Sequence, residues 1–471
     1  MIALTLAEVA AAIGGRLVDA PEPGAVVTGP VTVDSRQVGP GALFVALPGE
    51  RADGHDFAAA AVAAGAVGVL ATRAVGVPAI VVDEGVAALG RLARAALRRL
   101  PELAVVGVTG SSGKTSTKDV LAQVLAGLGP VVAPPGSFNN EIGLPLTVLR
   151  ADAATRALVL EYGARGRGHI RYLSELAPPR IAVVLNVGTA HLGEFGSREA
   201  IAAAKSELVE ALPAAADGGI AVLNADDPLV TAMDARTSAR VVRFGESPSA
   251  DVRATDVRLD ALGRAGFTLV TAGGSASVQL QVHGAHQVSN ALAAAAVALE
   301  LGLPPDAVAR GLGSAVALSR WRMEVVERAD GVVVINDAYN ANPDSMRAAL
   351  KALVDLAGGR RSWAVLGEMR ELGADAALEH DAIGRLAVRL DVSRLVVVGE
   401  AAKPMHLGAS LEGSWGEESV HVPDLDAAVA LLEDELAPGD VVLVKASRAA
   451  GLERVAQALL SEVPIAAGDP R

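Results

Sequence analysis

One short loop constrains the fold more than any other part of the sequence. Residues 104–108 are apolar and predict a buried strand, and a helical pattern runs over residues 114–128. The loop between them, residues 109–115, reads Thr-Gly-Ser-Ser-Gly-Lys-Thr. Small residues let backbone N–H groups curl around a phosphate, and the helix N-terminus adds partial positive charge. The stretch therefore predicts a phosphate site at the start of a helix.

This loop has the residues that a triphosphate site needs. Lys114 would neutralise phosphate oxygens, and the Thr115 hydroxyl would reach Mg²⁺. The spacing departs from the strict GxxxxGK[ST] pattern, because Val108 stands where the first glycine would be. A flexible turn with a surface lysine is the alternative. The residues expected to contact the nucleotide are Thr109, Gly110, Ser111, Ser112, Gly113, Lys114 and Thr115. On its own, the loop indicates only that ATP or GTP binds.

Strand and helix patterns alternate along the chain and divide it into three blocks. At about 150 residues per domain, a chain of 471 residues suggests three α/β domains, which we expect at 1–103, 104–318 and 319–471. The first is expected to be small, and the second to hold a parallel sheet covered on both faces. Residues 251–282 alternate apolar and polar side chains, which predicts an antiparallel insert. The third block predicts a second doubly wound, Rossmann-like sheet.

The composition narrows the classes of function. The net charge of −13 argues against a general nucleic-acid binder. The chain has no cysteine, which removes disulfides and thiol nucleophiles and fits a reducing compartment. The apolar run 57–71 is too short to span a membrane and predicts a helix ending near Gly65, followed by a strand. We expect a soluble, cytoplasmic protein without a secretory signal or membrane insertion.

Short segments spread over almost the whole chain carry a family resemblance. In order they are residues 34–36 (Asp-Ser-Arg), 40–49, 53–55, 139–145, 161–164, 186–193, 204–207, 286–290, 322–324, 337–343 and 443–445. Together with the phosphate loop they resemble the Mur ligases, the ATP-dependent amide-forming enzymes of peptidoglycan synthesis. Each segment alone is weak evidence, and their shared order carries the resemblance.

Within that family, three segments are similar to the members that add D-alanyl-D-alanine. They are residues 139–143 (Asn-Asn-Glu-Ile-Gly), 337–343 (Asp-Ala-Tyr-Asn-Ala-Asn-Pro) and 367–373 (Gly-Glu-Met-Arg-Glu-Leu-Gly). Two positions depart from the family pattern: Gln287 replaces an asparagine, and Ala446 replaces a glycine. The alternatives are a Mur-type ligase that adds diaminopimelate or lysine, a folylpolyglutamate synthetase, and a catalytically dead nucleotide-binding scaffold.

The resemblance implies a specific reaction, and we expect the enzyme to be a monomer. ATP would phosphorylate the terminal carboxylate of UDP-N-acetylmuramoyl-tripeptide. The amine of D-alanyl-D-alanine would then attack the acyl phosphate, giving the UDP-muramoyl-pentapeptide, ADP and phosphate. Two anions must approach each other in this reaction, so strong local positive charge from Mg²⁺ and lysine is required despite the acidic surface.

The resemblance also implies a catalytic and metal-binding set. Thr115 and Glu161 would hold one Mg²⁺, and His191 would reach a second. Lys205, within the helical residues 200–212, would be carbamylated by CO₂ and become an anionic ligand of the second ion. The implied catalytic residues are Lys114, Glu161, His191 and Lys205. From the residues alone the alternatives are a solvated acid for Glu161, a packed loop histidine for His191 and a snorkelling surface lysine for Lys205.

Three further residues would frame the nucleotide by family analogy. Asn290 would meet the adenine side, Arg322 the phosphates, and Asp337 the ribose or the incoming amine. Since Arg322 and Asp337 lie in the third block, ATP would be clamped between two domains that close on ligand binding. For Arg322 the alternative is a surface ion pair with Glu324 or Glu327.

The remaining expected contacts are with the two other substrates. They are Ser35 and Arg36 for the UDP moiety, Asn139 and Asn140 for the peptide or muramoyl part, and Tyr339, Asn340 and Asn342 for D-alanyl-D-alanine or the nucleotide. Asn342 could equally be only the cap of a helix. His55, His169 and His380 have no comparable context, and solvated or packed roles are expected for them.

Overall fold

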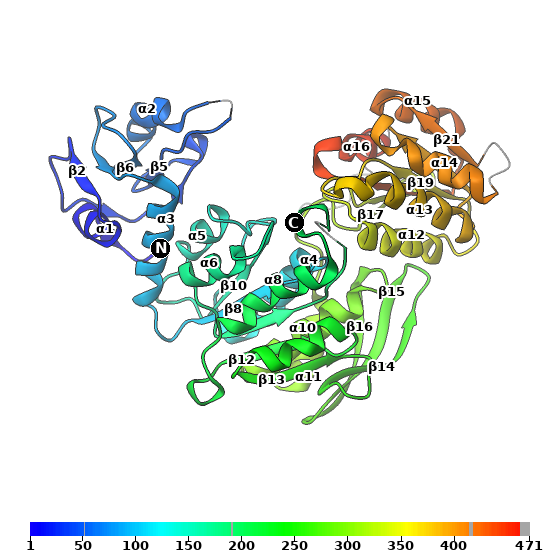
Figure 1. The fold of residues 1–471 in the computed structure, drawn as a ribbon, viewed down its shortest axis with the longest axis horizontal. Coiled ribbons are helices and arrows are strands. Elements are labelled where there is room, and N and C mark those ends of the chain that lie inside the picture. Colours follow the sequence, from blue (N-terminus) through cyan, green and yellow to red (C-terminus); the bar gives the residue numbers. More distant parts are fainter. Residues whose placement is uncertain (51, 190–191, 414–417, 462–471) are drawn as a thin grey trace.

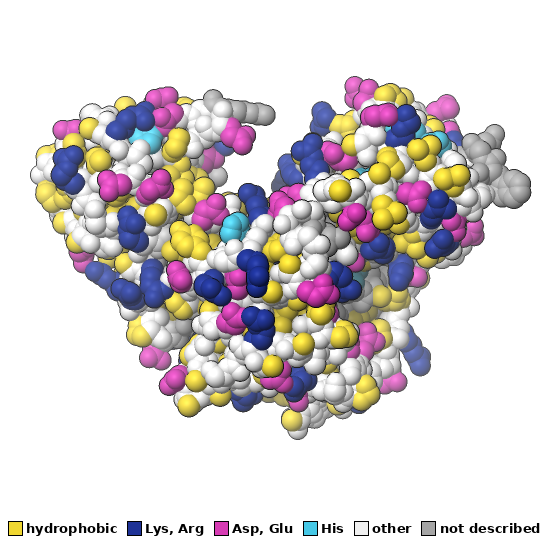
Figure 2. Space-filling model, in the orientation of Figure 1, with side chains coloured by type: hydrophobic (Ala, Val, Ile, Leu, Met, Phe, Trp, Pro, Cys, Tyr) yellow, Lys and Arg dark blue, Asp and Glu magenta, His cyan; other side chains and the backbone are white. Residues whose placement is uncertain are grey.

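Three sheets, one in each third of the chain, organise the molecule (Figure 1). The computed structural model describes residues 1–50, 52–189, 192–413 and 418–461. The sheets have five, nine and six strands, and a separate two-stranded pair joins β1 (Leu4–Thr5) to β3 (Val26–Val27). We call the parts built on them the first, middle and third regions. The predicted α/β fold is confirmed, and Figure 2 shows a wide hollow between the first and third regions.

The first region follows its local sequence signals. Its sheet has the order β2 (Arg16–Val18), β7 (Ala79–Val81), β6 (Gly68–Ala71), β5 (Leu43–Val45) and β4 (Val31–Thr32). Its helices are α1 (Leu6–Ile13), α2 (Ala58–Ala63) and α3 (Gly85–Arg98). Thr5 caps α1 in a reciprocal capping box with Glu8. The helix and strand predicted within the apolar run 57–71 are both present, as α2 and β6.

The middle sheet is parallel over most of its width. Its order is β16 (Gly274–His283), β15 (Arg264–Thr271), β14 (Val252–Leu259), β13 (Arg240–Gly245), β12 (Ile220–Asn224), β11 (Ile181–Val184), β8 (Ala104–Thr109), β10 (Ala157–Glu161) and β9 (Val131–Val132). The predicted antiparallel insert is present as β14, β15 and β16. It extends the main sheet, because Phe244 of β13 pairs in parallel with Val252 of β14.

Helices cover both faces of the middle sheet. They are α4 (Lys114–Leu125), α5 (Gly143–Val148), α6 (His169–Leu176), α7 (Leu192–Phe195), α8 (Arg198–Glu210), α9 (Pro228–Thr231), α10 (Gln287–Glu300) and α11 (Pro305–Ser314). Leu158 and Leu160 of β10 join the core that contains α5, α6 and α8. Ala157 and Val159 join the opposite core, with α4 and α10. Because successive side chains of a strand point to opposite faces, this fully buried strand reads as one continuous apolar run.

The third region is a second helix-covered sheet. Its order is β17 (Glu324–Glu327), β18 (Val333–Asn336), β22 (Val441–Lys445), β19 (Ser362–Leu366), β20 (Arg394–Val398) and β21 (Ser419–Val422), with only β17 antiparallel. Its helices are α12 (Pro343–Ala357), α13 (Ala376–Arg389), α14 (Lys403–Glu412), α15 (Leu425–Glu435) and α16 (Glu453–Ser461). Among the described helices, none combines the length and apolarity of a membrane span.

Sequence patterns miss the shortest and most polar strands. Neither the edge strands β9, β17 and β21 nor the internal strand β13 is predicted, and each is short or interrupted by charged or polar residues. These differences leave the arrangement around the phosphate loop unchanged.

Candidate active site

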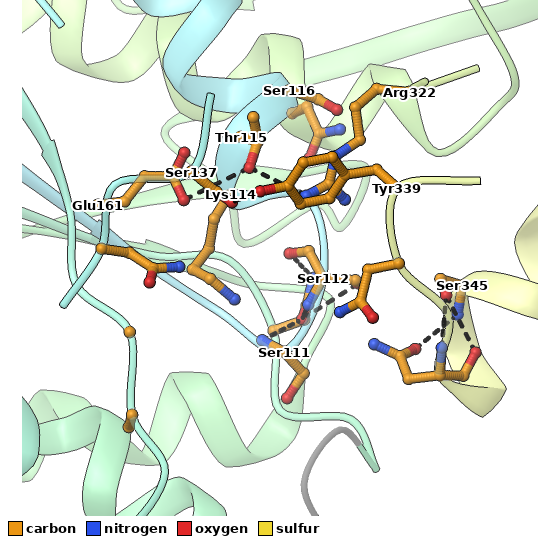
Figure 3. A pocket seen from close by; sticks show the side chains of 18 of the residues that line it. Ser111, Ser112, Lys114, Thr115, Ser116, Ser137, Glu161, Arg322, Tyr339 and Ser345 are labelled. Carbon is orange, nitrogen blue, oxygen red and sulfur yellow. Dashed lines mark hydrogen bonds between the residues drawn. The ribbon is translucent and has the colours of Figure 1, made fainter. Parts of the chain in front are cut away.

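A cavity of about 660 Å³ lies where the middle and third regions meet. The middle region contributes the phosphate loop, the end of β10 and Lys205, and the third region contributes Arg322, Asp337 and Lys445. In Figure 3, Lys114, Thr115 and Glu161 face Arg322 and Tyr339 across this space. A smaller cavity of about 220 Å³ shares Ser116, Gln287, Arg322 and Met323 with the first. The two halves that the sequence places far apart are therefore brought together.

The phosphate loop has the conformation that its glycines predict. Gly113 has φ +81°, and a Cβ atom on it would lie 2.5 Å from Oδ1 of Asn290, so only glycine fits. The helix α4 starts at the next residue, Lys114, whose Nζ donates to the Gly110 carbonyl at 2.7 Å. Burial lowers the pKa of Lys114, and Glu161 opposes that shift. The alternative of a flexible turn with a surface lysine is not what the structure shows.

Asn186 supports this loop and was not singled out from the sequence. Its Oδ1 atom accepts the backbone N–H groups of Ser111 at 2.9 Å and Ser112 at 3.0 Å. The available sequence signal was its place as the first residue of the family segment 186–193, where no role was assigned to it.

Glu161 is a buried carboxylate at the end of β10. It has no exposed surface, so the alternative of a solvated acid is wrong. The Thr115 hydroxyl donates to Oε2 at 3.4 Å, and Oε1 has no hydrogen-bond partner. Burial raises the pKa of Glu161, although the cations Lys114, Lys118 and Arg322 act in the opposite direction. A buried carboxylate with an unpartnered oxygen is costly unless something binds it.

This pair of oxygen donors fits Mg²⁺. The ion prefers hard oxygen ligands and is usually held by one or two carboxylates together with substrate phosphates and water. The unpartnered Oε1 of Glu161 and the adjacent Thr115 hydroxyl meet that requirement beside the phosphate loop. No group of three or more potential metal-binding side chains is found within the described ranges. His191, expected to reach a second ion, lies outside the described residues.

Lys205 is buried on α8 and lines the cavity. Only 7% of it is exposed, so the alternative of a snorkelling surface lysine is wrong. Burial, and secondarily the nearby charge of Lys114, lowers the pKa of Lys205 well below its ordinary value. A neutral amine is therefore accessible at this position at lower pH than for a surface lysine.

Arg322 reaches across from the third region to the phosphate loop. Its Nη2 atom lies 3.4 Å from the Thr115 hydroxyl, and its guanidinium stacks 4.2 Å from the ring centre of Tyr339. The alternative of a surface ion pair with Glu324 or Glu327 is therefore wrong. Trp321 and Met323, on either side of it, are left-handed at φ 59° and φ 51°. Such backbone strain marks segments whose geometry the surrounding fold enforces.

Asp337 and Lys445 form a buried ion pair on the same side of the cavity. Lys445 Nζ donates to Asp337 Oδ2 at 2.6 Å and to the Asn340 carbonyl at 2.9 Å. The Met323 N–H donates to the other Asp337 oxygen at 3.1 Å. Burial lowers the pKa of Lys445, and Asp337 opposes that shift. Each charge in this pair has an opposite charge within hydrogen-bond distance.

Several predicted asparagines and a tyrosine line the cavity while holding local structure. Asn342 caps α12 through the Ser345 N–H at 2.9 Å, so its alternative role as a helix cap is confirmed. Asn140 supports the start of α5 from outside the helix, where the Gly143 N–H donates to its Oδ1 at 2.8 Å. Tyr339 is hydrogen-bonded to Ser137 of the middle region at 2.7 Å. The other predicted residues on the lining are Asn139, Asn290 and Asn340, and Gln287 accepts from Asn290 there.

The two residues predicted to hold the UDP moiety lie elsewhere. Ser35 and Arg36 belong to a short helical turn of the first region (Ser35–Gln37) and are not on the lining of the cavity. The Arg36 side chain is 86% exposed and pairs with Asp34. His55 and His380 are buried and hydrogen-bonded, as expected for packed histidines.

His169 is exposed, as a solvated histidine is expected to be, and it also lines the cavity. It is the first residue of α6, and Glu207 fixes the start of that helix by accepting the N–H groups of Gly168 at 2.6 Å and Arg171 at 3.0 Å. The available signal was its position in the loop that follows the Glu161 strand.

Comparisons with known proteins cover nearly the whole chain. Family models match residues 30–99 (Mur ligase family, catalytic domain), 108–298 (Mur ligase middle domain) and 321–448 (Mur ligase, glutamate ligase domain). The UDP-N-acetylmuramoyl-tripeptide–D-alanyl-D-alanine ligase of Mycobacterium bovis is 57% identical, with 98% of each chain covered.

Two solved structures share the fold. The crystal structure of MurF from Acinetobacter baumannii has a TM-score of 0.87 at 32% identity and covers 97% of this chain and 99% of its own. The MurF ligase of Thermotoga maritima in complex with ADP has a TM-score of 0.79 at 32% identity, with coverage of 93% and 98%.

Proposed function

The chain belongs to the Mur ligase family, and from this premise we propose that it joins D-alanyl-D-alanine to UDP-N-acetylmuramoyl-tripeptide with conversion of ATP to ADP and phosphate. It is an ATP-dependent ligase that forms amide bonds in peptidoglycan synthesis. The relative with 57% identity, which carries that activity in its name, supports this acceptor and this donor.

One observation carries the proposal: the cavity combines a phosphate loop from the middle region with cationic side chains from the third. Lys114 and Thr115 stand on one side, and Arg322 and Lys445 on the other. An inert carboxylate becomes an electrophile only when phosphorylated, and two anions then have to meet. Cations contributed from two regions suit that requirement, because they converge only when both regions surround the substrates.

The chemistry assigns a role to each side of the cavity. A carboxylate oxygen of the tripeptide attacks the γ-phosphorus of ATP, and ADP leaves while Lys114 and Arg322 neutralise the transferring group. The amine of D-alanyl-D-alanine then attacks the acyl carbon, loses a proton and expels phosphate. Lys445 holds the Asp337 carboxylate in place through their hydrogen bond, and this fixed carboxylate is proposed to orient the amine or the ribose. Asn290, beside Gly113, is proposed to meet the adenine side.

The proposal includes Mg²⁺ at Thr115 and Glu161. Thr115 and Glu161 would hold the ion, whose positive charge would offset the negative charge of the phosphates. A second ion would be held by His191 and by Lys205 as a carbamate. A carbamate forms when a neutral amine adds CO₂ and releases a proton. The buried position of Lys205 favours the neutral amine that this step needs.

We further propose a division of labour among three domains. Residues 1–103 would bind the UDP part of the substrate, with Ser35 and Arg36 as contacts. Residues 104–318 would bind ATP, and residues 319–471 the acceptor, through Tyr339, Asn340 and Asn342. Asn139 and Asn140 would contact the peptide or muramoyl part. We propose that the enzyme works as a cytoplasmic monomer.

An acceptor screen tests the proposed function. ADP release is measured with UDP-N-acetylmuramoyl-tripeptide, ATP and Mg²⁺ while the acceptor is D-alanyl-D-alanine, diaminopimelate, lysine or glutamate. The proposal predicts rapid release with the dipeptide alone and a product with the mass of the pentapeptide precursor. Release that is faster with a single amino acid, or that is independent of both substrates, contradicts it.

A further inference from the structure

The loop that follows β11 lies between the phosphate loop and the third region. On one side, Asn186 Oδ1 accepts the N–H groups of Ser111 and Ser112. Two residues further on, the Gly188 N–H donates to the Ser111 hydroxyl at 2.9 Å. Residues 186–188 are therefore hydrogen-bonded to the phosphate loop, which is proposed to hold the triphosphate. These hydrogen bonds couple the position of residues 186–188 to that of the phosphate loop.

The other side of this loop is held by a carboxylate of the third region. Oδ2 of Asp344 accepts the Thr189 N–H at 2.7 Å and the Thr189 hydroxyl at 3.1 Å. Oδ1 of Asp344 lies 3.4 Å from Nη1 of Arg347, whose Nη2 is 3.0 Å from Glu379. Asp344 is the second residue of α12 and follows closely after Asn340 and Asn342, which line the cavity.

Two glycines let the regions approach this closely. A Cβ on Gly188 would lie 2.0 Å from Asp344 Oδ2, although the backbone of Gly188 is not left-handed. A Cβ on Gly193 would lie 2.5 Å from the backbone nitrogen of Gly373, in the third region. At Gly188 it is therefore the neighbour, and not the backbone conformation, that excludes a side chain. Gly188 follows β11 and Gly193 belongs to α7, so two separate segments of the middle region approach the third region closely.

We infer that Asp344 is a positioning residue that latches the third region to the phosphate loop through Thr189. The inference rests on the proposed function, because the reaction needs Lys114 and Thr115 at the same place as Arg322 and Lys445. Asp344 itself does not touch the reacting atoms. It favours the arrangement in which both halves of the cavity are assembled, and a ligand binds more weakly when that arrangement is less populated.

The kinetic signature follows from this role. Asp344→Ala removes a charge-assisted acceptor and should raise the KM for ATP and for D-alanyl-D-alanine about tenfold, with a smaller change in kcat. Asp344→Asn keeps an acceptor oxygen and should restore most of the affinity. Asp306→Ala is the matched control, because Asp306 also follows a proline at the second position of its helix, α11, and is exposed. It should behave as the wild type.

A double-mutant cycle tests the contact itself. Gly188→Ala should lower kcat/KM about tenfold or more in the wild-type chain, because its methyl group displaces the Asp344 carboxylate. In the Asp344→Ala background the collision is gone, and Gly188→Ala should cost less than about threefold. Equal losses from Gly188→Ala in both backgrounds would overturn the latch, as would wild-type kinetics in Asp344→Ala.

A distance measurement separates the latch from the proposed function. The chain has no cysteine, so Ser275→Cys in the middle region and Ser410→Cys in the third region, both at exposed positions, accept one spin label each. The distance distribution between the labels should broaden on Asp344→Ala and not on Asp306→Ala. An unchanged distribution overturns the latch. If the wild type fails to ligate, the proposed function fails, while the distance distributions still decide the latch.

Discussion

The two sides of the cavity treat their buried charges differently. On the middle-region side, Glu161 has an oxygen without a partner, and Lys205 is buried with a like charge nearby. On the third-region side, Asp337 and Lys445 satisfy each other at 2.6 Å. Glu161 and Lys205 on the middle side thus lack partners that only ligands could supply, whereas the Asp337–Lys445 pair is complete by itself, although Nε of the neighbouring Arg322 is also buried without a partner. This contrast suggests that the incompletely paired charges of the middle side lower the stability of the fold and serve ligand binding. The Asp337–Lys445 pair of the third side, in contrast, is preorganised.

The largest effect in this comparison is expected from removing the lysine cation of the phosphate loop. Lys114→Met should lower kcat/KM by about 10³ or more, because the transferring phosphoryl group loses its main protein cation. The free energy of unfolding should stay the same or rise, since the pKa of Lys114 is lowered by burial. Coupled ADP release and urea unfolding measure the two effects. Lys351→Met, on the exposed face of α12, is the control and should retain activity.

On the third side, removing one buried charge should lower the free energy of unfolding. Asp337→Asn leaves Lys445 as an unpaired buried cation and should lower the free energy of unfolding by roughly 3–5 kcal/mol. Adding Lys445→Met should recover much of that loss, because neither charge then remains. Urea unfolding of the single and double variants measures this. An Asp337→Asn protein as stable as the wild type would show that the pair does not hold this side together.

The pH dependence of the free energy of unfolding should show how much the buried Lys205 destabilises the middle-region side of the cavity. The folded pKa of Lys205 lies below the unfolded value of 10.5, so the unfolded chain binds more protons between the two values. The free energy of unfolding therefore rises with pH across that window. Lys205→Met should stabilise the protein by about 2 kcal/mol at neutral pH without bicarbonate, and the gain should shrink toward pH 10.5. A gain independent of pH would contradict this.

Glu161 should show the reverse pH dependence and a smaller effect. Its folded pKa is raised above 4.5, so the folded chain binds more protons between the two values, and the free energy of unfolding falls as pH rises through them. Glu161→Gln should raise that free energy by about 1 kcal/mol at pH 7 and abolish most activity. The gain should vanish as the pH falls toward 4.5. Thermal unfolding over a pH series measures it.

Sequence reasoning found the parts of the site whose signal is local. The phosphate loop follows from a short pattern, because strand, loop and helix are adjacent in the chain, whereas Glu161 was assigned by the family resemblance. It left open whether Lys205 is exposed, since an apolar helix with one lysine fits both a buried and a surface position. It missed Asn186 and Asp344, because their partners lie 74–75 and 155 residues away. The Asn186 contact depends on how β8 and β11 pair within the middle region, and the Asp344 contact on how the middle and third regions pack.

The central claim is that this divided cavity activates a carboxylate by phosphorylating it, and an oxygen label tests that most directly. UDP-N-acetylmuramoyl-tripeptide carrying oxygen-18 in its terminal carboxylate is incubated with the enzyme, ATP, Mg²⁺ and D-alanyl-D-alanine. The account predicts that the released inorganic phosphate carries the label, because the acyl phosphate breaks at the carbonyl carbon. Pentapeptide product formed together with unlabelled phosphate would contradict it.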